Sequence, residues 1–249
     1  MHRTEVVMGI PMSVDVRDLT DERSAAEAVD AAFAVLRSAD ERFSPYREDS
    51  ELRRYERGET APSADLQEIL QVARDASAAS SGAFSIQAPD GSLDTNGVVK
   101  GWAAERAAGV LREHGSRRFC LNAGGDVVTA GEPEPGRAWR AGVRDPFEPT
   151  RMMAVVELRD GAVATSGTYE RGAHVWDGRT GETGAALLSA TVVADDLTTA
   201  DVLATCVLVL GVEGVAWAFA HGAREAFGVL PDGRVVTRAG VAGVPVPLG

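Results

Sequence analysis

The chain contains one lysine, Lys100, among 25 basic residues, so arginine stands at all the other basic positions. A lysine ammonium is a compact point charge, whereas an arginine guanidinium is a wide planar fork. Lys100 follows the polar residues 94–97, and we expect a helix to open around Gly97. Backbone amides at a helix N-terminus favour an anion, which the Lys100 ammonium could also reach. The segment therefore indicates an anion site, although an Asp turn before an exposed lysine has the same pattern.

Asp201 and Thr205 stand four residues apart in a second segment that reads as a helix. Side chains at this spacing share one helix face. A carboxylate and a hydroxyl are hard oxygen ligands of the kind that Mg²⁺ prefers, and such an ion could clamp a pyrophosphate. On its own, the pair is more often a capping Asp and a Thr that bonds back to its own helix.

Residues 122–126 read Asn-Ala-Gly-Gly-Asp after a strand-like run. Paired glycines allow a tight turn or a close approach of the backbone to a ligand. The segment is neither a Rossmann fingerprint nor a P-loop, because no G-x-G-x-x-G or Gly-Lys-Ser/Thr is present. A hairpin turn is the favoured interpretation.

His174 is one of four histidines and lies in a run of polar, turn-forming residues. A neutral imidazole there could take a proton from an attacking hydroxyl, and a structural histidine that bonds a loop carbonyl fits equally well. Ser166 has no G-x-S-x-G elbow around it, so a hydrolase triad has no support.

The net charge of −12 gives no electrostatic support to a nucleic-acid partner. No apolar run is long enough to span a bilayer, and the N-terminus has no signal-peptide pattern, so we expect a cytoplasmic protein. Cys120 and Cys206 have no metal-type spacing and are expected to be reduced core thiols.

Hydrophobic periodicity predicts helices early and late in the chain and strands between them. This order indicates an α+β fold in a single domain over residues 1–249, without internal repeats. The expected helices are residues 21–39, 63–82, 97–115, 198–210 and 212–221. The expected strands are residues 4–18, 119–122, 139–143, 153–158, 162–165 and 187–194, with a final hairpin of 227–230 and 235–238.

Taken in order, these segments resemble the ApbE family of FAD:protein FMN transferases. The resemblance runs nearly end to end, and its pieces are modest singly but specific as an ordered series. They are Met8-Gly9, residues 43–46 with 49–52, residues 82–84, Asp94 with Lys100-Gly101, residues 122–126, residues 165–167 with 169–171, His174 with Asp177 and Thr180-Gly181, and Ala200-Asp201 with Ala204-Thr205.

The resemblance implies a mixed β-sheet core with packed helices, in a thioesterase-like architecture. It also implies that FAD is bound as a substrate, that its pyrophosphate is cleaved with Mg²⁺, and that FMN passes to a threonine of an acceptor flavoprotein while AMP leaves. Two alternatives remain open: an Mg²⁺-dependent FAD pyrophosphatase that gives FMN and AMP, and a non-catalytic flavin-binding protein.

The resemblance also assigns roles to individual residues. Asp201 and Thr205 match the side-chain metal ligands, and Asp201 also counts as a catalytic residue. Backbone oxygen near Gly97, together with Thr198, completes the metal shell that the resemblance implies. His174 matches the base that activates the acceptor threonine. The FAD contacts fall on Met8, Tyr46, Ala83, Phe84, Ser85, Asp94, Lys100 and Val175.

The chain departs from the family pattern at two positions. Ser85 stands where the family usually has Asp after Gly-x-Phe, and Gly178 replaces the proline of the usual Asp-Pro. The segment between Ser85 and Asp94 is also short, which trims one expected wall of the adenine or ribose pocket.

Overall fold

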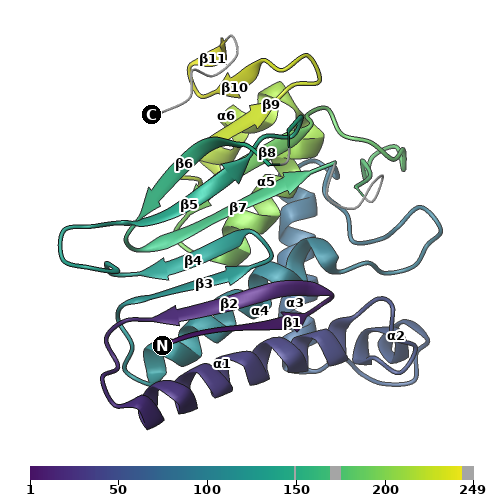
Figure 1. The fold of residues 1–249 in the computed structure, drawn as a ribbon. Coiled ribbons are helices and arrows are strands. Elements are labelled where there is room, and N and C mark those ends of the chain that lie inside the picture. Colours follow the sequence, from purple (N-terminus) through teal and green to yellow (C-terminus); the bar gives the residue numbers. More distant parts are fainter. Residues whose placement is uncertain (149, 169–174, 243–249) are drawn as a thin grey trace.

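The computed structural model of the chain describes residues 1–148, 150–168 and 175–242 (Figure 1). The strands are β1 (His2–Val7), β2 (Ile10–Val16), β3 (Phe119–Ala123), β4 (Asp126–Ala130), β5 (Trp139–Arg144), β6 (Met152–Leu158), β7 (Gly161–Gly167), β8 (Ser189–Ala194), β9 (Glu225–Val229), β10 (Val235–Thr237) and β11 (Gly240–Ala242). The helices are α1 (Glu22–Phe43), α2 (Glu51–Glu56), α3 (Ala64–Ala79), α4 (Asn96–Glu113), α5 (Leu197–Leu210) and α6 (Val212–Ala220).

One large sheet runs in the order β1-β2-β3-β4-β7-β8-β9-β10-β11, and β5 pairs with β6 in a separate hairpin. The predicted α+β class is confirmed, but every pairing between these strands is antiparallel, so the sheet is not mixed. The reason is that each helical segment between two neighbouring strands, α1–α4 and α5–α6, starts and ends at the same end of the sheet. The Arg17 N–H donates to the Arg118 carbonyl at 2.9 Å, and the Arg224 N–H donates to the Val193 carbonyl at 2.7 Å.

The helices cover one face of this sheet (Figure 1). α1 packs along α4, and α5 packs on α4, β7 and β8. α1 begins where Asp21 accepts a hydrogen bond from the Ser24 N–H at 2.8 Å, and its buried side chains recur at helical spacing. This layer holds the main core and sets the N-terminus of α4 against the side of α5.

The β5–β6 hairpin covers part of the opposite face. A small apolar cluster joins the hairpin to β4, β7 and β8, formed by Val127, Ala141, Leu158, Val163 and Val193. Along β5, buried side chains alternate with exposed ones, which is the pattern of a strand buried on one face only. The fold therefore has three layers, of helices, sheet and hairpin.

The prediction of one strand over residues 4–18 is wrong, because the chain reverses at Met8 and Gly9, with φ of 53° and 72°. The turn predicted at residues 122–126 is confirmed: Gly124 and Gly125 have φ of 69° and 114° and join β3 to β4. Cys120 and Cys206 are free thiols, and burial raises the pKa of each to about 12. Within the described residues, no helix combines the length and apolarity needed to cross a bilayer.

Candidate functional site

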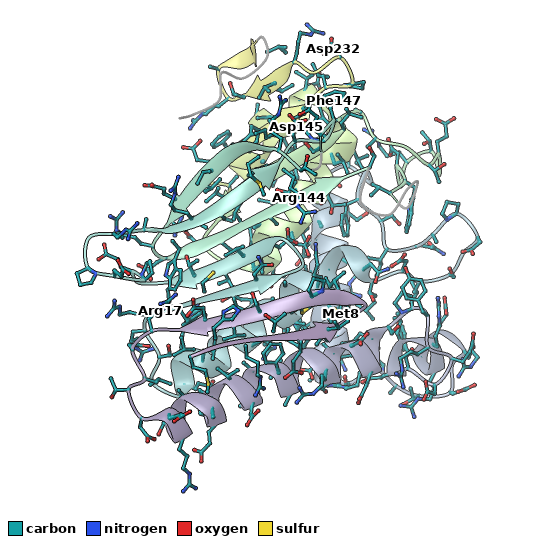
Figure 2. All side chains as sticks on the ribbon, in the orientation of Figure 1. Met8, Arg17, Arg144, Asp145, Phe147 and Asp232 are labelled. Atoms are coloured by element: carbon teal, nitrogen blue, oxygen red, sulfur yellow. The ribbon has the colours of Figure 1, made fainter. Side chains whose placement is uncertain are left out.

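A cavity of about 660 Å³ opens at one end of the sheet, between the β1–β2 turn, the first turn of α4 and one face of α5. Its volume lies within the range of pockets that bind cofactor-sized ligands. Figure 2 shows Met8 and Arg144 toward this end of the sheet and Arg17 toward the other. The cavity draws on segments from residue 8 to residue 209, so only the tertiary fold assembles it.

Most of the residues singled out from the sequence line this cavity. They are Met8, Tyr46, Ala83, Phe84, Ser85, Asp94, Gly97, Lys100, Val175, Asp201 and Thr205. Thr198 does not line it and lies half-buried in the first turn of α5. His174 lies outside the described residues, so its predicted role stays a prediction.

Lys100 and the buried Asp201 line the cavity, and the buried Asp126, which does not line it, contacts Lys100. The Lys100 Nζ contacts Asp126 Oδ2 and lies 3.5 Å from Asp201 Oδ1. Asp126 and Asp201 are each 2% exposed, and the Lys100 side chain is 21% exposed. Lys100 is therefore part of a charge cluster, and the interpretation as a surface lysine is excluded.

Asp201 is held by the neighbouring helix. It lies inside α5, and the helix is capped by Asp196, which accepts from the Thr199 N–H at 2.8 Å, so Asp201 is not the capping residue. The Gly101 N–H donates to Asp201 Oδ2 at 3.0 Å. A lysine on α4 and a backbone amide beside it thus fix both oxygens of one buried carboxylate.

Burial is the largest influence on the ionisation of Asp201. Burial and the nearby Asp126 carboxylate raise the pKa of Asp201, the Lys100 ammonium and the Gly101 N–H lower it, and the net result is a rise from 3.8 to about 7. The cluster contains two carboxylates around one ammonium. A cation bound beside Asp201 would relieve this local excess of negative charge.

Hydroxyl groups complete a set of oxygen donors beside Asp201. Thr205 Oγ1 lies 3.1 Å from Ser166 Oγ and donates to the Asp201 carbonyl at 3.3 Å. Carboxylate, hydroxyl and carbonyl oxygens suit Mg²⁺. Among the described residues, no three His, Cys, Asp or Glu side chains cluster as a metal cage.

The N-terminus of α4 points its first turn into the same cavity. Thr95 precedes the helix, but its hydroxyl donates to the Phe43 carbonyl at 3.1 Å and does not cap the helix. Asn96 and Gly97 line the cavity beside Lys100. The helix dipole and the ammonium therefore favour an anionic group here, in a chain whose net charge is −12.

Two loops form the rim above α4, and Arg53 ties them together. Its guanidinium donates to the Pro45 carbonyl at 2.8 and 2.6 Å and to the Leu93 carbonyl at 3.2 Å. Across the rim, the Asn96 side-chain amide donates to the Tyr46 hydroxyl at 3.0 Å. Tyr46 itself is 76% exposed, so its ring is available to a ligand.

The two departures from the family pattern lie against each other. A Cβ on Gly178 would lie 2.7 Å from the Ser85 Cβ and 2.4 Å from the Gly82 carbonyl oxygen. The Gly178 N–H donates to the Ala83 carbonyl at 3.0 Å. A proline has neither this N–H nor room here, so glycine at 178 belongs with the local backbone around Ser85.

Sequence reasoning gave no role to three residues of the cavity, nor to Asp126 beside it. Asp126 and Ser166 belong to the motifs at residues 122–126 and 165–167, but their contacts with Lys100 and Thr205 were not predicted. Arg144 and Trp176 also line the cavity, and the buried Nε1–H of Trp176 has no acceptor among the described residues. The motifs mark Asp126 and Ser166 but not their partners, which lie 26 and 39 residues away along the chain, and no sequence signal marks Arg144 or Trp176.

The sequence pattern of the ApbE family matches residues 8–88 and 85–227 of the chain. These ranges cover the whole cavity lining and most of the fold. The chain belongs to the ApbE family.

Curated relatives of this ApbE chain carry the name FAD:protein FMN transferase. The chain is 35% identical over 155 residues to the protein of Rhodobacter capsulatus, covering 57% of this chain and 29% of that protein. It is 32% identical over 168 residues to the protein of Treponema pallidum, covering 60% of this chain and 46% of that one. The matched stretches thus span less than half of either relative.

Solved ApbE structures share the whole fold. A flavin transferase ApbE from Vibrio cholerae, the H257G mutant, superposes with a TM-score of 0.81 at 20% identity, covering 97% of this chain and 95% of that one. The ApbE protein of Thermotoga maritima gives 0.82 at 21% identity, covering 95% and 96%. At these identities the likeness establishes the fold of the ApbE chain.

Proposed function

We propose that this ApbE chain is an Mg²⁺-dependent FAD:protein FMN transferase, which cleaves the FAD pyrophosphate and attaches FMN to a threonine of an acceptor flavoprotein. The observation that carries the proposal is the charge cluster of Lys100, Asp126 and Asp201, whose Lys100 and Asp201 line a cofactor-sized cavity beside the N-terminus of α4. The names of the curated relatives supply the reaction.

The cavity residues divide the work of binding FAD. Lys100 and the α4 N-terminus attract the pyrophosphate, while Tyr46, Phe84 and Met8 offer apolar and aromatic surface for the rings.

Asp201 and Thr205 would hold Mg²⁺, with backbone oxygen near Gly97 in support. Held there, Mg²⁺ would supply positive charge that stabilises the pyrophosphate oxygens during cleavage. Asp126 and the Gly101 N–H keep Lys100 and Asp201 in place. Thr198, which does not line the cavity, can contribute only through backbone or a longer reach along α5.

In the proposed transfer, the threonine oxygen bonds to the phosphorus of the FMN phosphate as the bond to the AMP oxygen breaks. The acceptor hydroxyl loses its proton, which His174 is proposed to take, and AMP leaves with the bridging oxygen. Transfer to water in place of threonine would give FMN and AMP by the same displacement.

Mass spectrometry of an acceptor flavoprotein incubated with the chain, FAD and Mg²⁺ tests the proposal. The expected result is an acceptor that carries FMN on a threonine, with AMP released in equal amount. Asp201→Asn should abolish both products. AMP without acceptor labelling would favour the pyrophosphatase, and unchanged FAD with a correctly folded protein would refute both enzymatic readings.

A further inference from the structure

A second, smaller cavity lies on the opposite face of the sheet from the helices. Its volume is about 240 Å³, and it runs between the outer face of β3 and β4 and the near side of the β5–β6 hairpin. Its floor is mixed, with the polar Asn122 and Thr129 and the apolar Cys120 and Val127 from the sheet. Arg144, the last residue of β5, lines both this cavity and the main one, so the two cavities lie next to each other at that residue.

Two arginines place positive charge at the rim of this cavity. Arg140 and Arg144 are exposed on the same face of β5, about 13 Å apart along the strand, since a strand rises about 3.3 Å per residue. Within the described residues, neither makes a hydrogen bond or an ion pair, whereas most arginines of this chain face a carboxylate. Two such cations in a chain of net charge −12 indicate an acidic ligand.

The edge of β5 that borders this cavity also carries unpaired backbone groups. β5 pairs only with β6 in the described part of the chain, so its other edge offers N–H and C=O groups to an added strand. Between the two arginines, the half-exposed Met152 lies over Gly142, where it gives an adaptable apolar contact. A groove with a free strand edge, an apolar centre and two cations fits an extended polypeptide.

We propose that this groove binds an extended, acidic segment of the acceptor protein and guides its threonine past Arg144 into the main cavity. The inference rests on the proposed function, because it assigns the acceptor side of that reaction. The groove is too small for the dinucleotide that the main cavity accommodates, and Arg140 lies outside the main cavity. The acidic groups of the segment would stand four residues apart, to match the spacing of the arginines.

Peptide binding tests the groove separately from the chemistry. The probes are two fluorescent peptides with one threonine each: the first has two aspartates four residues apart, and the second has asparagines in their place. Binding to the full chain is measured by fluorescence anisotropy. We expect the aspartate peptide to bind about tenfold or more tightly than the asparagine peptide, with an affinity that falls as salt rises.

Charge reversal identifies the residues. Arg140→Glu should lower the affinity for the aspartate peptide about tenfold or more, and Arg140→Gln should lower it less. The matched control is Arg74→Glu on α3, an exposed arginine whose side chain donates to Gln71 of its own helix, and this variant should bind the peptide as the wild type does. Thermal unfolding of every variant checks that each one folds.

Release of AMP from FAD and Mg²⁺, followed in the same samples, separates the two proposals. Three results would contradict the proposed peptide groove. They are equal binding of both peptides, no peptide binding at about 1 mM, and a loss of FAD binding together with peptide binding in Arg140→Glu. Selective binding of the aspartate peptide without FAD cleavage would support the groove and refute the transferase. FAD cleavage together with equal binding of the two peptides would refute the peptide groove and leave the proposed transferase activity standing.

Discussion

Gly101 of α4 lies directly against Asp201 of α5, with no side chain between the α4 backbone and the carboxylate. The Gly101 N–H donates to Asp201 Oδ2 at 3.0 Å, and a Cβ on Gly101 would lie 2.8 Å from the Asp201 Cβ and 2.7 Å from the Leu197 carbonyl oxygen. The lack of a side chain at 101 therefore permits the contact that fixes the buried carboxylate.

Gly101→Ala should push α4 and α5 apart, because both nearest atoms belong to backbone or to a packed Cβ. We expect a loss of about 1–3 kcal/mol in the free energy of unfolding and weaker Mg²⁺ binding. Denaturant unfolding and titration with Mg²⁺ measure the two effects. Gly109→Ala on the same helix is the control: with nothing within 4 Å, it should stabilise the helix by about 0.5–1 kcal/mol.

Asp201→Asn should change the pH dependence of stability in protein freed of metal with EDTA. Because burial raises the pKa of Asp201 from 3.8 to about 7, the folded state holds a proton there that the unfolded state has released. The contribution of this group to stability is thus fully present below pH 3.8 and is lost as the pH rises through about 7. Asparagine does not titrate, so the stability of the variant relative to the wild type should increase between pH 4 and 8.

The same Asp201→Asn protein should not respond to Mg²⁺, because its amide replaces a carboxylate ligand. Wild-type protein at pH 8 should unfold at a higher temperature with Mg²⁺ than with EDTA, as expected for an ion that binds only the folded state. Differential scanning fluorimetry measures the shift. An equal Mg²⁺ shift in both proteins would exclude Asp201 as a metal ligand.

Lys100→Met should leave Asp126 and Asp201 buried without their ammonium. Removal of one partner of a buried ion pair costs about 3–5 kcal/mol, because an uncompensated charge remains. A second change, Asp126→Asn, should recover part of this loss. A double-mutant cycle by urea unfolding tests the coupling, and strictly additive single effects would contradict the contact between Lys100 and Asp126.

Arg53→Ala should weaken FAD binding about tenfold, with a smaller effect on the rate at saturating FAD. Arg53 joins the Pro45 and Leu93 carbonyls and therefore sets the two loops that carry Tyr46 and Asp94. Fluorescence titration with FAD measures the change. Arg54→Ala, at an exposed neighbour on the same helix, is the control, and an equal loss of affinity there would rule out the positioning role of Arg53.

The amino-acid sequence by itself determined the helices, because their apolar residues recur with the helical period wherever a face is buried. It also singled out the residues whose chemistry is rare in this chain, Lys100 above all, and the ordered motifs that place it in its family. The helix that opens near Gly97 and the turn at residues 122–126 are local features, and both are confirmed.

Only the tertiary structure decided which charges meet. Asp126 contacts Lys100 because β4 begins beside the first turn of α4, and residues 26 positions apart carry no local signal of that pairing. The reversal at Met8 was missed because a non-glycine residue with positive φ is held by its surroundings, here the Asp40 carboxylate, which accepts from the Met8 N–H at 3.1 Å. Local spacing fixes a helix, but burial and long-range packing fix a site.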